Sequence, residues 1–322
     1  MRLSGTLILP ASVPPYPAVV MAHGSGAEGR WANRFLAQRF AEAGVGALIF
    51  DKRGVGKSTG DWRAAGFEDL AADVASGVTL LRARRDIRAQ SIGLFGHSQG
   101  GTILPIAATA AGGVAFLIAS AASAVPTDSA EPFSLRNATG FSTLPPDEAA
   151  QANQYVEAVV AVAYHGAPRA RLDSLAAAFA GKPWYFPLPP PTSHYWAFSR
   201  RIAAYDPRAH WMQVRAPVLL TYGAADQRVP PEASVQAIRA ALAAAGRDPP
   251  IVCIYAGADH TQRVRRPGDV WPRNAEGYLE DLIAWVRSAA GLERSGPRNV
   301  RLSEACSFVR PAAGPPGRRE SR

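Results

Sequence analysis

The segment Gly96-His97-Ser98-Gln99-Gly100 carries a serine in the G-x-S-x-G spacing of a nucleophile elbow. An apolar run precedes it and an Ala-rich stretch follows it, so the serine is expected on a sharp turn from a strand into a helix. Gly96 and Gly100 would remove the Cβ atoms that clash in such a strained turn. The pattern predicts Ser98 as a nucleophile; the alternative is an inert serine in a glycine-rich turn.

A nucleophilic serine needs a general base and an acid that orients this base. His260 follows the apolar run IVCIYAG, and Asp226 follows the run PVLLTYG, so both are expected at the carboxyl edge of a sheet. The chain order Ser98, Asp226, His260 is the one used by hydrolases with this type of turn. Asp259 is a weaker candidate for the acid, because its side chain would have to fold back onto His260. The other histidines lack the required position: His23, His97, His165, His194 and His210.

A serine nucleophile of this kind performs acyl transfer, in which negative charge develops on the attacked carbonyl oxygen. Backbone N–H groups that stabilise this charge form an oxyanion hole. The N–H of Gln99, directly after the serine, is one candidate. The second is expected in the loop after the run AVVMAH, where Ser25 is the donor and Gly24 its neighbour. Four further side chains are candidate substrate contacts, and packing inside the protein is the alternative for them: His23, His194, Trp184 and Tyr195.

The spacing of apolar residues predicts an α/β scaffold for these groups, with a mostly parallel sheet and helices on both faces. Continuous apolar runs such as VGALIFD and VAFLIAS are typical of strands buried on both faces. The stretches between them have apolar residues at helical spacing, for example in 67–84 and 231–245. Alternation of strands and helices in this way is characteristic of the α/β class.

The alternation stops between residues 125 and 215, where proline and aromatic residues are dense. We expect a lid inserted here between the sixth and seventh strands; its aromatic residues could instead form a small core of their own. The main domain then comprises residues 1–124 and 216–290. From 291 to 322, low hydrophobicity combined with Pro, Gly and Arg predicts a disordered tail.

Two glycine-rich loops resemble nucleotide-binding motifs. DKRGVGKSTG (51–60) ends like a phosphate-binding P-loop, but Asp51 occupies the place of its first glycine and would repel a phosphate. GSGAEG (24–29) has the G-x-G-x-x-G spacing of a dinucleotide site, with Asp51 near the expected acid position. His23 replaces the small residue usual before this motif, and a dinucleotide fold leaves the Ser, Asp and His set unexplained. No cofactor and no metal are therefore expected.

The charge and the apolar runs exclude other classes of function. The net charge is +9, but segment 293–322 holds seven Arg and three Glu, and the remaining excess is scattered. No nucleic-acid partner is therefore predicted. The uncharged run 100–125 is divided by Gly112-Gly113, which favours a helix and a strand over a membrane span.

The cysteines and the amino terminus bear on the cellular compartment. Cys253 lies in an apolar run and is expected to be a buried small hydrophobe, whereas Cys306 lies in the tail. Neither has a partner at metal-ligand spacing, and no disulfide framework is expected. No signal peptide is recognised, so a cytoplasmic location is expected.

Together, HGSG, DKRGVGKSTG, GHSQGG, the loop at Asp226 and GADH resemble the α/β-hydrolase superfamily, in particular bacterial serine esterases grouped with prolyl-oligopeptidase-like and dienelactone-hydrolase-like proteins. The resemblance covers residues 3–290 and implies an α/β-hydrolase fold. It also implies Ser98 as the nucleophile, His260 as the base and Asp226 as its partner.

In such proteins D-x-R-G-x-G-x-S recurs after the strand next to the oxyanion strand, so the DKRGVGKSTG loop is expected to be a structural turn in which Asp51 and Arg53 pair. The expected function is hydrolysis of a small-molecule carboxylic ester through an acyl-enzyme, with an apolar acyl or alcohol group suggested by the aromatic lid. A peptidase or amidase with the same three residues is the alternative, because both reactions need the same groups. A non-catalytic binder is a further alternative, which a missing triad residue would favour, and none is missing. The oligomeric state stays open.

Overall fold

The computed structural model describes residues 1–307 except 139 and 295. Within this part, eight strands form one sheet in the order β1-β3-β2-β4-β5-β6-β7-β10. Its strands are β1 (Gly5–Ile8), β2 (Tyr16–Ala22), β3 (Gly46–Phe50), β4 (Ile87–His97), β5 (Leu117–Ser120), β6 (Val218–Gly223), β7 (Ile251–Tyr255) and β10 (Cys306–Ser307). Strands β2 to β7 are parallel, whereas β1 and β10 pair antiparallel at the two edges. This is the mostly parallel sheet of the α/β-hydrolase fold, as predicted.

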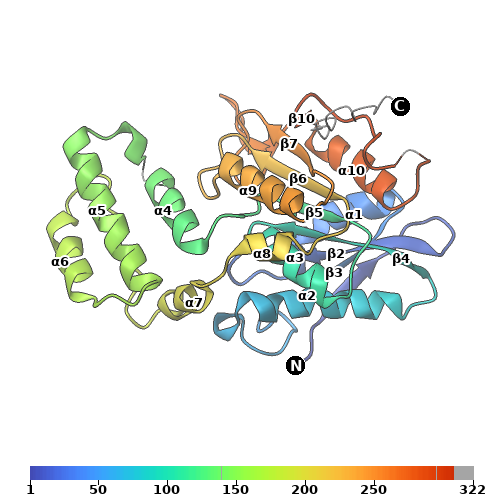
Figure 1. The fold of residues 1–322 in the computed structure, drawn as a ribbon, viewed down its shortest axis with the longest axis horizontal. Coiled ribbons are helices and arrows are strands. Elements are labelled where there is room, and N and C mark those ends of the chain that lie inside the picture. Colours follow the sequence, from blue (N-terminus) through green and yellow to red (C-terminus); the bar gives the residue numbers. More distant parts are fainter. Residues whose placement is uncertain (139, 295, 308–322) are drawn as a thin grey trace, which may run out of the picture.

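Helices cover both faces of the sheet (Figure 1). One face is packed against α2 (Phe67–Arg82), α3 (Gln99–Ala110), α8 (Pro207–Trp211) and α9 (Pro231–Ala244), and the other against α1 (Arg34–Glu42) and α10 (Tyr278–Ala289). Every residue of β2 and β6 is buried, which confirms the prediction of strands covered on both faces. Among the described helices, none is both apolar enough and long enough to cross a membrane.

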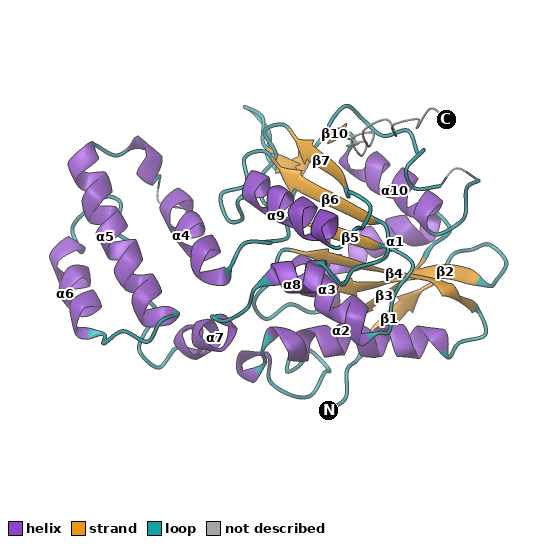
Figure 2. Cartoon of the chain, viewed as in Figure 1, coloured by secondary structure: helices purple, strands orange, loops and turns teal. Residues whose placement is uncertain are grey.

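A helical insertion lies between β5 and β6. It contains α4 (Thr127–Ala138), the short 3-10 helix η3 (Phe141–Thr143), α5 (Pro146–Ala163), α6 (Ala170–Phe179) and α7 (His194–Ile202), which form a lobe at the left of the sheet in Figure 2. The prediction that it lies between the sixth and seventh strands was wrong, because only five strands of the sheet precede it. The insertion has an apolar core of its own, formed by Phe141, Ala152, Tyr155, Val156, Ala158, Val159, Leu172 and Trp184.

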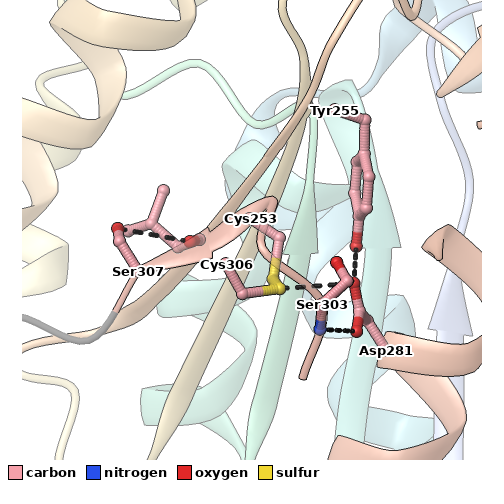
Figure 3. The surroundings of a disulfide bond; sticks show 7 residues. Cys253, Tyr255, Asp281, Ser303, Cys306 and Ser307 are labelled. Carbon is pink, nitrogen blue, oxygen red and sulfur yellow. Dashed lines mark hydrogen bonds between the residues drawn. A yellow bond between two sulfur atoms is a disulfide. The ribbon is translucent and has the colours of Figure 1, made fainter. Parts of the chain in front are cut away.

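Strand β10 lies within the segment predicted to be a disordered tail from residue 291, so this prediction was wrong for the described residues up to 307. Strand β10 pairs with β7, and the antiparallel register sets Cys306 opposite Cys253. The two form a disulfide across 53 residues of sequence (Figure 3). The expectation of no disulfide was wrong, because sequence spacing does not reveal which strands pair. The part of the disordered-tail prediction that falls on residues 308–322 lies outside the described residues.

Asp281 of α10 anchors the same segment from inside the protein. The carboxylate is buried and accepts hydrogen bonds from Ser303 N–H at 2.7 Å and Ser303 Oγ–H at 2.6 Å (Figure 3). Tyr255 of β7 donates its hydroxyl to the same carboxylate at 3.2 Å. Hydrogen bonds to a buried charge are roughly twice as strong as neutral ones, so they hold the chain that leads to Cys306 against α10.

The DKRGVGKSTG loop follows β3 and is held by two ion pairs between elements. Asp51 pairs with Arg30 at 2.8 Å, and Arg53 pairs with Asp73 of α2 at 2.7 Å. The expected pairing of Asp51 with Arg53 was therefore wrong: each side chain reaches across to another element. Hydrogen bonds from Arg30 hold the pKa of Asp51 well below its usual range.

Neither glycine-rich loop has the surroundings that a nucleotide site requires. The Asp51 carboxylate accepts from Arg30 and from the Lys57 N–H at 3.1 Å, so it is engaged where a ribose would need it. The DKRGVGKSTG loop leads into a short 3-10 helix, η2 (Trp62–Ala64), and α2 begins only at Phe67. A P-loop instead runs directly into a helix whose N-terminus faces the phosphates.

Candidate active site

Ser98 stands on the turn between the end of β4 and the start of α3. Its backbone has φ 55° and ψ −123°, a strained combination for a residue other than glycine, which costs about 1–3 kcal/mol. Hydrogen bonds hold the turn on both sides, from Ser98 N–H to Ser120 O at 2.8 Å and from Thr102 N–H to Ser98 O at 3.0 Å. This strained turn holds the serine at the carboxyl edge of the parallel strands, as the motif predicted.

The glycines of the elbow permit two close backbone approaches. A Cβ on Gly96 would lie 2.4 Å from the carbonyl group of Gly100. A Cβ on Gly100 would lie 2.5 Å from the carbonyl oxygen of His23, directly after β2. Real Cβ atoms do not come so close to backbone atoms, so both positions require glycine. The elbow is therefore packed directly against the strand that leads into the predicted oxyanion loop.

His260 lies between Ser98 and Asp226. Its Nε2 is 2.9 Å from Ser98 Oγ, and its Nδ1 is 2.8 Å from Asp226 Oδ2. A carboxylate can only accept, so Nδ1 carries the proton and Nε2 is left to accept from the serine hydroxyl. The Asp226 side chain is fully buried, and its other oxygen accepts from Arg228 N–H at 2.7 Å and Val229 N–H at 3.0 Å. The structure thus brings the three predicted residues into one hydrogen-bonded chain.

Gln262 fixes the loop that carries His260 and was not identified from the sequence. It is 1% exposed, accepts from Ser120 Oγ–H of β5 at 3.0 Å, and donates to His260 O at 3.2 Å. It has a positive φ of 56°, which a glutamine rarely adopts. A single glutamine two residues after a histidine gives no sequence signal, because its partner is 142 residues away.

Asp259, the weaker candidate for the acid, is used within the loop. Its Oδ1 accepts from Thr261 N–H at 2.8 Å and from Arg263 N–H at 3.0 Å, just before the small antiparallel pair of β8 (Arg263–Val264) and β9 (Arg273–Asn274). This side chain therefore closes a turn, and the carboxylate beside His260 Nδ1 is that of Asp226.

His97 is the residue before the predicted nucleophile and packs in the elbow. Its ring centroid is 5.0 Å from that of His260. Burial, together with the neighbouring His260, lowers the pKa of His97 to about 4, so this ring is neutral at physiological pH. His97 also lines a hollow of about 280 Å³ together with Gly24, Glu28 and Gln262.

The loop predicted to supply an oxyanion donor spans residues 23–26, directly after β2. The N–H of Gly24 donates to the Glu28 carboxylate at 2.8 Å and is thus already engaged. Ser25 lies exposed at the tip of the loop. Gln99, the other predicted donor, is the first residue of α3, so its N–H is one of the groups for which a helix start offers no internal acceptor.

Lys52 is buried beneath this loop and was not identified from the sequence. It is 3% exposed, and its Nζ donates to the carbonyl oxygens of Gly24 and, at 2.8 Å, of Gly26. The side-chain oxygen of Gln99 lies 3.4 Å from the same Nζ. A lysine between Asp51 and Arg53 in a turn looks like an ordinary surface residue in the sequence, so nothing there indicated these contacts.

The predicted substrate contacts fall into two groups. His23 and Trp184 are buried, with 5% and 1% exposure, so the alternative of packing inside the protein describes both. The His23 ring donates to Phe50 O, and Trp184 packs against Phe141 in the insertion core. His194 is exposed at the start of α7, where its ring contacts Trp62 with centroids 4.8 Å apart.

Tyr195, the fourth predicted contact, is half-buried and donates its hydroxyl to Glu131 of α4 at 3.0 Å. Burial raises the pKa of Glu131, which the hydrogen bond from Tyr195 partly offsets. Tyr195 is therefore part of the packing between α4 and α7 within the insertion.

Among the described residues, one group has the spacing of a metal site: Cys253, Asp281 and Cys306. The two cysteines are joined in a disulfide and provide no thiolate, and Asp281 is bound to Ser303 and Tyr255. This group is used as a structural link.

The chain is similar to known proteins both in sequence and in structure. A sequence profile of the family described as serine aminopeptidase, S33, matches residues 14–262, which is most of the chain. A thiohydrolase of Aspergillus aculeatus is 37% identical over 101 residues. This matching stretch covers 31% of the chain and only 30% of the thiohydrolase.

Solved structures resemble the whole scaffold. The monoacylglycerol lipase of Paleococcus ferrophilus gives a TM-score of 0.55 at 20% identity, over 90% of this chain and 100% of the lipase. Est1E of Butyrivibrio proteoclasticus, solved with bound ferulic acid, gives 0.54 at 18% identity, over 88% of this chain and 92% of Est1E. At these identities the likeness shows the α/β-hydrolase fold.

Proposed function

Because the chain belongs to the serine aminopeptidase S33 family of α/β-hydrolases, we propose that it is a serine hydrolase that cleaves carboxylic esters of modest size through an acyl-enzyme. The observation that carries this proposal is the position of His260, with one ring nitrogen 2.9 Å from Ser98 Oγ and the other 2.8 Å from Asp226. Such a chain of contacts activates a serine, whose hydroxyl is a weak nucleophile when unassisted.

In the first half of the reaction, Ser98 Oγ attacks the ester carbonyl carbon while His260 Nε2 takes the hydroxyl proton. The resulting imidazolium is stabilised by the Asp226 carboxylate. When the tetrahedral intermediate collapses, the bond to the alcohol oxygen breaks and His260 returns the proton to this leaving group. The products of this half are the free alcohol and an acyl group bound to Ser98.

The second half repeats these steps with water in place of serine. His260 removes a proton from a water molecule, whose oxygen attacks the acyl carbon. The bond to Ser98 Oγ then breaks, Ser98 regains its proton, and the carboxylic acid leaves. In both halves a negative charge develops on the carbonyl oxygen. We assign its stabilisation to the backbone N–H groups of Ser25 and Gln99, which donate hydrogen bonds to it. Removing one such donor typically lowers kcat by about 10²–10³-fold.

We propose an ester rather than an amide on two grounds. Solved structures with this fold include a monoacylglycerol lipase and Est1E with bound ferulic acid. Aromatic residues are also dense in the helical insertion, which we propose acts as a lid over an apolar substrate group. The family description of an aminopeptidase favours the alternative, an amidase or peptidase with the same three residues.

The test is hydrolysis of p-nitrophenyl esters of increasing acyl length by the wild type and by Ser98→Ala. We expect the variant to be slower by about 10³-fold or more, as for the loss of a triad nucleophile. Ser174→Ala, an exposed hydroxyl on α6, is the matched control and should keep wild-type rates. Aminoacyl p-nitroanilides in the same assay distinguish an amidase from an esterase.

Three results would contradict the proposal. Equal activity of wild type and Ser98→Ala would show that another group performs the chemistry. Equal inactivity on all esters and anilides would favour a binding protein on this fold. Tight binding of ATP or NAD would instead favour the nucleotide-binding interpretation of the glycine-rich loops, and no binding at millimolar concentration would exclude it.

A further inference from the structure

Lys52 is a buried cation, and its acidic sequence neighbour Asp51 pairs with Arg30 instead of with it. Arg53 pairs with Asp73. Lys52 instead donates to the carbonyl oxygens of Gly24 and Gly26, and its Nζ lies 3.4 Å from Gln99 Oε1. Burying an ammonium is costly, and such groups are found where their hydrogen bonds are satisfied. Here all three acceptors belong to residues around the proposed oxyanion hole.

The contact with Gly24 O is the informative one. This carbonyl and the Ser25 N–H belong to the same peptide group, because the bond that links the two residues joins the Gly24 C=O to the Ser25 nitrogen. The positive charge of the Lys52 ammonium beside the carbonyl oxygen draws electron density from the peptide nitrogen. This makes the N–H of the same peptide group a stronger donor. Chains of hydrogen bonds strengthen one another in this way by about 10–30% per bond.

The contact with Gly26 O holds the other side of the loop. Gly24 and Gly26 flank Ser25, and Gly26 has a positive φ of 87°, so the loop contains two residues with wide backbone freedom. Hydrogen bonds on the carbonyls before and after Ser25 remove this freedom. Oxyanion stabilisation depends on donors that are already oriented when charge develops, so this restraint matters for catalysis.

We propose that Lys52 is the positioning residue of the oxyanion hole, which orients the Ser25 N–H and polarises it through the Gly24 carbonyl. The proposal rests on the proposed serine hydrolase function, since it assigns a role within that same site. Lys52 does not touch the substrate; it acts through the peptide group that does. Its third contact, with the Gln99 side chain, links it to the residue that supplies the second N–H donor.

The charges around Lys52 determine how the contacts respond to pH. Burial lowers the pKa of Lys52 to about 8, and the carboxylate of Glu28 opposes this shift. The other ionisable groups near it are His23 directly after β2 and Asp73 of α2, the latter bound to Arg53. The ring of Trp62 lies 5.9 Å from Nζ. Above pH 8 the neutral amine keeps only two N–H donors for three acceptors, so the loop loses both charge and one hydrogen bond.

The experiment compares kcat and KM of the wild type, Lys52→Met and Lys57→Met on a p-nitrophenyl ester between pH 6.5 and 10. Methionine keeps the length and apolar stem of lysine without its charge, and Lys57 is an exposed lysine of the same loop. We expect Lys52→Met to lower kcat by about 10- to 100-fold with little change in KM, somewhat less than the loss of a whole oxyanion donor. The fall of kcat above pH 8 should be present in the wild type and in Lys57→Met and absent in Lys52→Met.

Amide hydrogen exchange of the segment 22–30 supplies a readout that does not require hydrolysis. Exchange at Gly24 and Glu28, whose N–H groups donate to the Glu28 carboxylate and to Gly26 O, should be faster in Lys52→Met than in the wild type, and unchanged in Lys57→Met. If Lys52→Met does not fold, the wild type alone is measured from pH 7 to 9.5. After correction for base-catalysed exchange, the protection of this segment should fall as Lys52 loses its proton.

The proposal would be overturned if Lys52→Met kept the wild-type kcat, or if its kcat still fell above pH 8. Unchanged amide exchange in the segment 22–30 of this variant would overturn it as well. These failures leave the serine hydrolase function standing, because the wild type would still cleave esters in a Ser98-dependent way. If the wild type cleaves no ester while exchange still rises in Lys52→Met, the proposed function fails. The proposed role of Lys52 in catalysis then fails together with the proposed function. What remains is that its hydrogen bonds restrain the loop 23–26.

Discussion

Asp226 Oδ2 lies 2.8 Å from His260 Nδ1, while Asp226 Oδ1 accepts from the N–H groups of Arg228 and Val229. The carboxylate is therefore fixed by its own backbone on one side and orients the histidine on the other. Asp259, the direct sequence neighbour of His260, instead closes a turn through Thr261 and Arg263. These two carboxylates provide a matched pair for testing the assignment of the acid.

We predict that Asp226→Asn lowers kcat by about 10³–10⁴-fold with little change in KM, because an amide favours the wrong histidine tautomer. Asp259→Asn should stay close to wild type, since the amide oxygen still accepts from Thr261 and Arg263. Steady-state kinetics on the ester selected with the wild type measure both. A large loss in Asp259→Asn with none in Asp226→Asn would reverse the assignment.

His23 makes the free energy of unfolding depend on pH. Burial lowers its pKa from the ordinary 6.5 to about 4, so the folded protein keeps this ring neutral while the unfolded chain takes up a proton. The contribution of His23 to the free energy of unfolding is fully present above pH 6.5 and is lost as the pH falls toward 4. Between pH 7 and pH 5 we expect a loss of about 2 kcal/mol from His23 alone. His97, whose pKa is also lowered to about 4, acts in the same direction.

Urea unfolding at pH 7 and pH 5 tests this dependence. His23→Gln keeps an N–H donor for Phe50 O and removes the titrating ring, so the difference between the two pH values should shrink. His194→Gln replaces an exposed histidine and should leave the difference unchanged. Equal pH dependence in all three proteins would mean that other groups cause it.

The disulfide between Cys253 and Cys306 is expected to stabilise the fold by closing a loop of 53 residues. Loop-closure entropy gives about 4 kcal/mol for this length, and measured values for native disulfides are usually about 2–4 kcal/mol. We predict that dithiothreitol, or the double substitution Cys253→Ser with Cys306→Ser, lowers Tm. Activity on small esters should persist at a temperature below the new midpoint, since β10 lies at the sheet edge.

An unchanged Tm and a count of two free thiols in the untreated protein would contradict the pairing. The result also bears on where the protein resides. Disulfides persist mainly in oxidising compartments, so a bridged pair would speak against the cytoplasmic location expected from the sequence, which stays a prediction.

Trp184 tests whether the aromatic residues of the insertion serve packing or substrate binding. Its ring is 1% exposed and contacts Phe141 and Phe179. Trp184→Ala should lower the free energy of unfolding by about 3–5 kcal/mol, as for other large residues removed from a core. His194→Ala should leave stability nearly unchanged, because the ring is exposed, and any contact with substrate would appear as a higher KM.

The milder substitution Trp184→Phe separates the two roles more cleanly, since it keeps most of the packing. We expect kcat/KM to remain at the wild-type value for short and long p-nitrophenyl esters. A change in the acyl-length profile in Trp184→Phe without loss of Tm would show that the ring does reach the substrate.

Local patterns in the sequence were enough to predict the elements and the strained turn. Continuous apolar runs identified strands such as β2 and β6, because a strand buried on both faces must be apolar along its whole length. The elbow at Ser98 was predictable because the G-x-S-x-G spacing is local, and Gly96 is required by the carbonyl group of Gly100, four residues away. The apolar runs before Asp226 and His260 likewise placed both at the carboxyl edge of the sheet.

Tertiary structure alone decided which side chains meet. Ser98 and His260 are 162 residues apart, and their contact depends on strand order, register and the turn held by Gln262. The same is true of Lys52 beneath the oxyanion loop and of Cys253 opposite Cys306. The sequence neighbourhood of a residue indicates which element it belongs to and which apolar residues are buried, because apolar residues recur at the period of the element. Its partner is set by the packing of separate elements, and no local pattern contains that information.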